Sequence, residues 1–172
     1  MKIKKVFMSL LGFGVLITLI PQSGNAYNHN SSKLYEPKDA YYWIHGVFAD
    51  YGLTSEIRRG LTAWNTLPEI EFTKEVSLPG GADVKMEYVD SLWSDNYAVH
   101  RGNGNITFYK NWRTDLNSTR RKETAVHEVG HAIGLAHTQK ANNSIAVMRE
   151  YDFNDKDYPL SDDKDGVKAK YK

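Results

Sequence analysis

The sequence predicts a single α+β domain. Its 172 residues suit one domain with its own core, and the spacing of apolar residues alternates between strand-like and helical periods along the chain. A strand, a helix, several strands and then helices follow one another, which is an order typical of an α+β fold. We place the domain at residues 41–172, behind a flexible polar segment at 27–40 and a leader at 1–26.

The leader differs in composition from the rest of the chain. Three lysines precede an uncharged apolar run (6–20), and the small residues Gly24 and Ala26 follow it. This pattern predicts a signal peptide that is cleaved between Ala26 and Tyr27, and hence a secreted protein. A membrane anchor is the alternative, but the 15 apolar residues are fewer than the roughly 20 that a spanning helix needs.

Composition limits the partners and the metal ligands. Without the three lysines of the leader, the 22 basic and 21 acidic residues become 19 and 21, so the mature chain carries a net charge of about −2 and shows no sign of nucleic-acid binding. The chain has no cysteine, which excludes disulfides, lipid attachment at cysteine and thiolate ligands. Any zinc site must therefore use histidine and carboxylate. We expect a monomer without a membrane anchor.

The predicted strands share alternating apolar positions or a high content of aromatic and β-branched residues. They are residues 41–48, 70–76, 82–89 and 105–112. In the third of them, Val84, Met86 and Tyr88 lie on one face. Residues 90–104, which are rich in Asp, Asn, Ser and Gly, are predicted to form a loop.

Three helices are predicted. In the first, apolar residues recur at i, i+4 and i+7 from Ile57, and Thr54 or Ser55 is expected to cap the helix. The second carries the histidines described next. The third has Ser161 as its cap, acids in its first turn and lysines in its last, an arrangement that complements the helix dipole.

The stretch HEVGHAIGLAH (127–137) contains three histidines and a glutamate. His127 and His131 are four residues apart, so on a helix they project from the same face and can bind one zinc ion at about 2.0–2.1 Å. Glu128 lies about 100° from His127 round the helix and about 60° from His131. It can therefore stand beside the metal without ligating it, where a general base would take a proton from water.

A zinc site that keeps one position open needs a third protein ligand. Gly134 can adopt the left-handed conformation that ends a helix, which turns the chain so that His137 reaches the same ion. On the opposite side of the helix, Val126, Val129 and Ile133 share a stripe that should pack on the core. The sequence thus predicts one catalytic zinc ion on three histidines, with the glutamate as base.

The pattern HExxHxxGxxH resembles the zinc signature of the metzincin metalloendopeptidases, and Thr138 directly after it is similar to the matrixin branch of that family. The resemblance covers roughly residues 41–171. It implies a zincin-like fold: a twisted, mainly parallel sheet with an edge strand at the cleft, two long helices and a C-terminal helix. It also implies that Met148 is the Met-turn residue beneath the zinc. Tyr151 either lines the main substrate pocket or anchors its loop to the core. The strand at 105–112 should border the cleft and pair with an extended polypeptide substrate.

The sequence departs from the matrixins in several respects. It has neither the cysteine nor the room for the propeptide that blocks the zinc in many of them. The stretch that commonly holds a second, structural zinc contains only His100, so that site is expected to be absent. Calcium is possible but no ligand spacing supports it, and a solvated surface is the favoured interpretation for Asp90, Asp95 and the acids at 152–157.

Together these features predict a secreted zinc metalloendopeptidase, which hydrolyses peptide bonds with a zinc-activated water and Glu128 as base. Two alternatives stay open. A zinc-holding binding protein needs no base beside the metal and usually has four protein ligands, so Glu128 argues against it. A hydrolase with a non-peptide substrate could use the same site, and only the resemblance to endopeptidases speaks against it.

Overall fold

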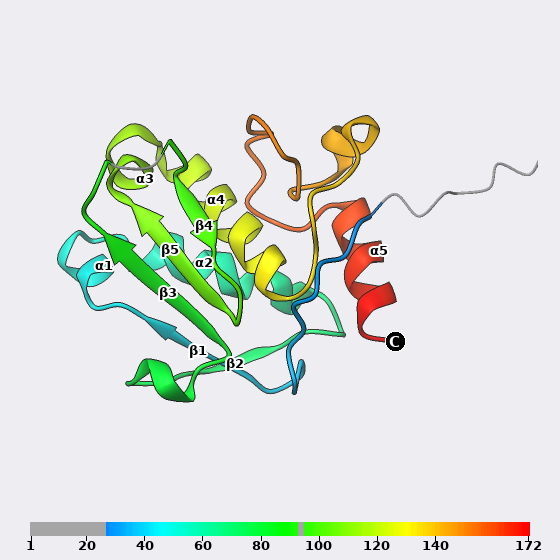
Figure 1. Cartoon of the computed structure of the whole chain (residues 1–172), viewed down its shortest axis with the longest axis horizontal. Helices are drawn as coiled ribbons and strands as arrows, with labels where there is room; N and C mark the ends of the chain where they lie inside the picture. The colour runs from blue at the N-terminus through cyan, green and yellow to red at the C-terminus, as the bar shows by residue number, and fades with distance from the viewer. Residues whose placement is uncertain (1–26, 93–94) are drawn as a thin grey trace, which may run out of the picture.

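The computed structural model describes residues 27–92 and 95–172 (Figure 1), so the predicted signal peptide at 1–26 lies outside the described residues. A five-stranded sheet has the order β2-β1-β3-β5-β4. Its strands are β1 Ala40–Ile44, β2 Phe72–Glu75, β3 Val84–Val89, β4 Ala98–His100 and β5 Asn105–Tyr109. Neighbouring strands are parallel except for β4 and β5, which are antiparallel. The sheet is therefore mainly parallel with a short antiparallel edge strand, which confirms the predicted fold class.

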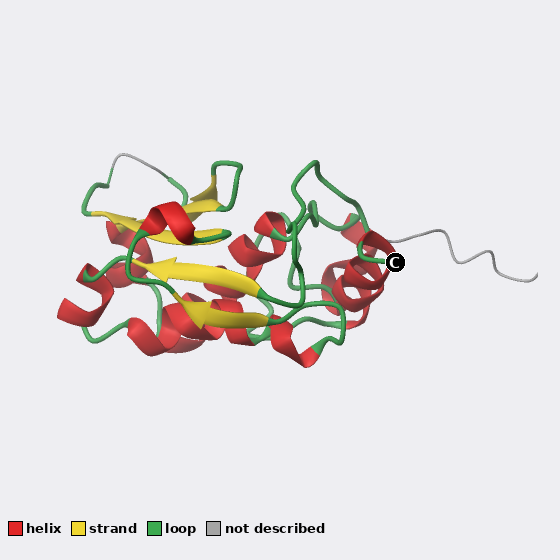
Figure 2. Cartoon of the chain, turned by 90° about the horizontal axis from the view of Figure 1, so that it is seen from below, coloured by secondary structure: helices red, strands yellow, loops and turns green. Residues whose placement is uncertain are grey.

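Five α-helices accompany the sheet in the described part of the chain. They are α1 Val47–Asp50, α2 Thr54–Thr62, α3 Lys110–Asp115, α4 Ser118–Ala132 and α5 Ser161–Lys170. Helices α2 and α4 lie side by side on one face of the sheet, and α5 stands beyond the end of α4 (Figures 1 and 2). None of the helices in the described ranges combines the length and the apolar character that crossing a bilayer requires.

The core lies between the sheet and the paired helices α2 and α4. Val126, Val129 and Ile133 are completely buried, so the apolar stripe predicted for the histidine-bearing helix is confirmed. The indole Nε1–H of Trp64, in the short 3-10 helix η1 (Trp64–Thr66) that follows α2, donates a hydrogen bond to the carbonyl of Val126 in α4 at 3.1 Å. Because one face of α4 is committed to the core, its histidine face points away from the core.

Two of the predicted strands are longer than the observed ones. Each prediction included a buried aromatic residue that the structure places in the following helix. The strand expected at 41–48 ends at Ile44, and Phe48 lies in α1. The strand expected at 105–112 likewise gives way to α3, which contains Trp112. The rings of Phe48 and Trp112 meet edge to face, with centroids 5.8 Å apart. Aromatic residues are common in strands because their side chains pack well on a sheet. Here the two rings pack against each other from helices instead.

The predicted loop at 90–104 is wrong at Ala98–His100, which form the edge strand β4. Three residues are too few for alternation to be detected in a sequence. The strand exists because its neighbour β5 supplies an antiparallel partner, with Val99 opposite Thr107. Neighbouring β3 is as predicted, since Val84 and Met86 are buried and Tyr88 packs against the core on the same face.

Neither predicted hydroxyl cap is used. The N-cap of α2 is Leu53, and the hydroxyl of Ser55 donates instead to the carboxylate of Glu56 at 2.7 Å. The N-cap of α5 is Leu160, whose backbone N–H donates to Asp163 at 2.8 Å. The carboxylate of Asp163, at the third position of the helix, thus takes part of the capping role that was expected of Ser161.

Replacing Gly60 with alanine is expected to lower the free energy of unfolding by about 1–3 kcal/mol. A Cβ at Gly60 in α2 would come within 2.7 Å of the Cβ and 2.9 Å of the carbonyl oxygen of Ala125 in α4, so the two helices would have to move apart. Urea unfolding measures the change. Gly46→Ala is the matched control, because a Cβ there meets nothing within 4 Å. Equal stability of the two variants would contradict the close packing of α2 and α4.

Candidate active site

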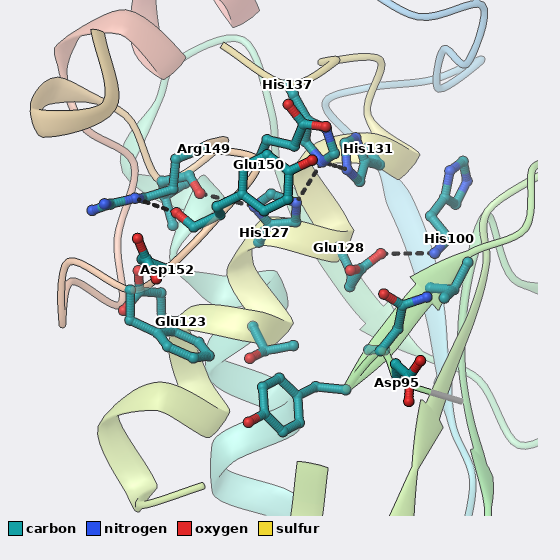
Figure 3. A pocket seen from close by; sticks show the side chains of 18 residues that line it. Asp95, His100, Glu123, His127, Glu128, His131, His137, Arg149, Glu150 and Asp152 are labelled. Atoms are coloured by element: carbon teal, nitrogen blue, oxygen red, sulfur yellow. Dashed lines mark hydrogen bonds between the residues drawn. The ribbon is translucent and has the colours of Figure 1, made fainter. Parts of the chain in front are cut away.

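Helix α4 carries three of the four residues of the predicted site. His127, Glu128 and His131 lie on its face away from the core, and α4 ends at Ala132. Gly134 follows with φ of +103°, a conformation that costs glycine little free energy and other residues much more, as the turn predicted from the sequence requires. This turn brings His137 back to the other two histidines (Figure 3).

The three imidazoles converge on one point. The Nε2 atom of His137 lies 3.3 Å from Nε2 of His127 and 3.2 Å from Nε2 of His131, and the three candidate ligand atoms all lie within 4.8 Å of one another. Tetrahedral zinc with Zn–N bonds of 2.0–2.1 Å requires ligand nitrogens about 3.4 Å apart. The spacing of the three Nε2 atoms therefore fits a zinc ion between them.

In two of these histidines, hydrogen bonds determine which ring nitrogen carries the hydrogen. Nδ1 of His127 lies 2.8 Å from the carbonyl oxygen of Val147, and Nδ1 of His131 lies 2.9 Å from that of Leu135. A carbonyl can only accept, so each Nδ1 carries the hydrogen and each Nε2 presents a lone pair. Burial, reinforced by neighbouring histidines, lowers the pKa of His127 to about 3 and that of His131 to about 4. Neutral imidazoles with converging lone pairs are what a metal cation needs.

Glu128 lies beside the three histidines and is 7% exposed. Its Oε2 accepts the backbone N–H of His100 at 2.7 Å, which ties the carboxylate to the edge strand β4 (Figure 3). Burial raises the pKa of Glu128 to about 7, and the hydrogen bond from His100 opposes this shift. The carboxylate is thus held by one oxygen close to the metal position, with a proton affinity suited to exchange near neutral pH.

A cavity of about 510 Å³ opens in front of the site. Its walls are the segment 95–100, which includes β4, the histidine face of α4, and the loop 147–153 (Figure 3). The expectation that the strand at 105–112 borders the cleft is wrong, because β5 lies inside the sheet between β3 and β4. The sequence misled here because β4 was interpreted as a loop, which left β5 as the apparent edge.

Tyr151 lines the cavity and its side chain is 70% exposed, so it lies at the rim and does not anchor its loop in the core. Two other aromatic residues also line the cavity. The rings of Tyr97 and Phe153 lie 5.9 Å apart and join the strand side of the cavity to the loop side. Nothing in the sequence pattern pointed to this pair, because its members are 56 positions apart.

Met148 is buried directly beneath the histidine-bearing helix. A Cβ at Gly130 would collide with its sulfur, so the glycine allows the thioether to pack against the backbone of α4. The backbone N–H groups of Val147 and Met148 donate to the two carboxylate oxygens of Asp163 at 2.8 and 3.2 Å. Asp163 was not predicted as a site residue, yet it fixes the segment whose carbonyl orients His127.

No other cluster of three potential metal ligands is present in residues 27–92 and 95–172. Asp90, Asp95 and the acids at 152–157 form no such group, so the described structure gives calcium no support. His100 lies on β4 next to the site, with its ring stacked on His131 at a centroid distance of 6.4 Å.

The fold and the site define a zinc-dependent peptidase: two helical histidines with a glutamate between them, and a third histidine beyond a glycine turn, face a cavity bordered by a strand edge. The family model for matrixins matches residues 45–172. The chain belongs to the matrixin family and is a zinc metalloendopeptidase. The resemblance noted in the sequence is thereby confirmed. Among curated proteins, none matches the chain.

In the metal-free protein, the contribution of His127 and His131 to the free energy of unfolding is expected to fall as the pH falls from 6.5 to about 4. The unfolded chain protonates His127 and His131 at the ordinary pKa of 6.5, whereas the folded chain keeps them neutral down to about 3 and 4. At these two residues the unfolded state therefore binds more protons in this window, which favours unfolding. Burial raises the pKa of Glu128 to about 7 and that of Asp163 to about 6, so these carboxyl groups contribute in the opposite direction. Urea unfolding in chelator at several pH values measures the slope. The double variant His127→Gln, His131→Gln isolates the histidine contribution. Its free energy of unfolding should rise less with pH than that of the unsubstituted protein, and an equal slope in the two proteins would contradict the assignment.

Proposed function

We propose that the protein is secreted as a monomer and cleaves polypeptides that bind in extended form along β4. The observation that carries the proposal is the convergence of three Nε2 atoms beside a buried carboxylate at the wall of one cavity. Support for secretion comes from the sequence alone, through the apolar run and small residues that precede Tyr27.

His127, His131 and His137 would hold the zinc through Nε2, which leaves one coordination position for water or substrate. When bound, zinc supplies Lewis-acid polarisation of the scissile carbonyl and lowers the pKa of a water molecule to roughly 7. Glu128 takes the proton of the attacking water at the carboxylate and later gives it to the leaving amine. The backbone N–H of His100 keeps the carboxylate in place while its charge changes.

The substrate would lie antiparallel or parallel to the free edge of β4. This strand ends the sheet and is paired only with β5 among the described strands. Apart from the N–H of His100, which donates to Glu128, its outer backbone groups are available to an added strand. A substrate side chain would enter the cavity between α4 and the loop 147–153. Tyr151 at its rim and the Tyr97–Phe153 pair favour apolar or aromatic side chains there.

Digestion of an unfolded protein tests this function. Purified protein is incubated with casein, with and without a zinc chelator, and the fragments are identified by mass spectrometry. Cleavage at internal peptide bonds that stops on chelation and returns when zinc is added supports the proposal. An absence of cleavage in zinc-loaded samples, together with release of product from non-peptide esters, would favour the alternative hydrolase.

A further inference from the structure

Residues 28–30, which we call the strap, lie against the turn that connects the second and third histidines of the site. The polar composition predicted a flexible segment here, but the backbone of the strap pairs with the turn. Asn30 N–H donates to the carbonyl of Gly134 at 3.0 Å, and the carbonyl of Asn28 accepts from Ala136 N–H at 2.9 Å. Figure 1 shows this blue segment passing between the end of α4 and α5.

The side chain of Asn30 holds the end of the ligand helix. Its Nδ2 donates to the carbonyl of His131 at 2.9 Å and to that of Leu135 at 2.8 Å. The carbonyl of His131, in the last turn of α4, also accepts the N–H of Gly134 at 3.1 Å, so Asn30 adds a second donor to a carbonyl at the C-terminal end of the helix. The carbonyl of Leu135 is also the acceptor for Nδ1–H of His131, at 2.9 Å. Asn30 therefore fixes the group that sets the tautomer and ring orientation of His131.

The side chain of Asn28 acts on the third histidine. Its Nδ2 donates to the carbonyl of His137 at 2.9 Å. The strap thus touches the backbone of two histidines of the site, His131 through Asn30 and His137 through Asn28. His127 is oriented separately, by the carbonyl of Val147.

On its other side the strap is attached to α5. Nε2 of His29 lies 2.9 Å from the carbonyl of Gly166, and Nζ of Lys170 donates to the carbonyl of Asn30 at 2.7 Å. A Cβ at Gly166 would come within 2.8 Å of Leu135, so α5 and the ligand turn are in close contact beside the strap. The strap is wedged between α5 and the turn, which gives the turn little freedom to move.

We propose that Asn28 and Asn30 are positioning residues of the metal site and that its affinity for zinc depends on them. Without the hydrogen bonds from Asn28 and Asn30, the turn would become ordered only when the ion binds. The entropy lost in that step would lower the affinity for zinc. Outer partners of metal-ligating histidines typically change metal affinity by about 10–100-fold. The inference rests on the proposed three-histidine zinc site but not on any substrate.

Asn30→Asp tests the proposal. Aspartate keeps the acceptor oxygen that the backbone N–H of Ser32 uses at 2.7 Å, so the local turn is preserved. It cannot donate to the carbonyls of His131 and Leu135, and it places a carboxylate oxygen against them. Competition with a chromophoric chelator should show zinc binding at least about tenfold weaker. The visible absorption of the cobalt-substituted protein should also change, because it reports the ligand geometry.

Tyr171→Phe is the matched control. The hydroxyl of Tyr171 donates to the carbonyl of Ile133 at 2.8 Å and accepts from Leu34 N–H at 3.0 Å, so it joins the same elements without touching a histidine of the site. Its loss should lower the stability of the metal-free protein and leave zinc affinity unchanged. Asn28→Asp, at an exposed position, provides a second test through His137 and is expected to fold normally.

The proposal is overturned if Asn30→Asp and Asn28→Asp both bind zinc within about twofold of the unsubstituted protein. It is equally overturned if Tyr171→Phe loses as much affinity as they do, because the strap would then act only through stability. If the two aspartate variants bind zinc more weakly but no sample cleaves casein, the positioning role of Asn28 and Asn30 is supported and the proposed function is contradicted.

Discussion

Replacing Glu128 with glutamine is expected to lower kcat for peptide hydrolysis by about 10²–10⁴-fold while the zinc stays bound. Glutamine has the shape of the glutamate, and its amide oxygen can still accept the backbone N–H of His100 that Glu128 accepts at 2.7 Å. It cannot take a proton from water. Hydrolysis of a fluorogenic peptide gives kcat, and elemental analysis of the same samples gives the zinc content.

Glu71→Gln is the control for this experiment, because Glu71 is an exposed carboxylate on the approach to β2 and far in sequence from the site. It should leave kcat and zinc content unchanged. A Glu128→Gln protein that retains kcat within about threefold would remove Glu128 as the general base, since proton transfer by a positioned base is worth at least about 10²-fold.

Replacing His131 with alanine is expected to weaken zinc binding by more than about 100-fold and to abolish hydrolysis. Changing an outer partner of a ligand already costs about 10–100-fold in affinity, and here a metal–nitrogen bond itself is lost. Free zinc at 100 times the dissociation constant should raise the free energy of unfolding of the unsubstituted protein by about 2.7 kcal/mol. Thermal unfolding with and without zinc should show this gain, and it should disappear in the variant.

His45→Ala separates loss of a ligand from loss of any histidine. Nδ1 of His45 accepts only the nearby backbone N–H of Val47, at 3.2 Å, and the residue lies between β1 and α1. This variant should keep the zinc-dependent gain in stability. An equal gain in His131→Ala and His45→Ala would show that zinc acts at another place on the protein.

The metal site could be predicted from the sequence because its geometry is local. His127, Glu128 and His131 are placed by the pitch of one helix, and Gly134 and His137 lie within one turn of its end. The structure brings the three Nε2 atoms of these histidines together. The partners that orient the ring nitrogens could not be predicted in the same way.

Those partners come from distant parts of the chain. The carbonyl that orients His127 belongs to Val147 and is fixed by Asp163, and the turn that carries His137 is held by Asn28 and Asn30. Periodicity describes one segment at a time, so it carries no information on these contacts, which span from 16 to 109 positions. The same limit explains the missed strand β4, whose three residues become a strand only beside β5.

X-ray absorption at the zinc edge is the most direct test of a catalytic metal at the three histidines. The protein is loaded with one equivalent of zinc for this measurement. We expect three histidine nitrogens at about 2.0–2.1 Å from the zinc and one further oxygen from water. That oxygen should be replaced when a zinc-binding inhibitor is added. A spectrum that requires four protein ligands would contradict a catalytic zinc, because no coordination position would be open for hydrolysis. A spectrum with fewer than three histidine nitrogens would contradict the assigned ligands.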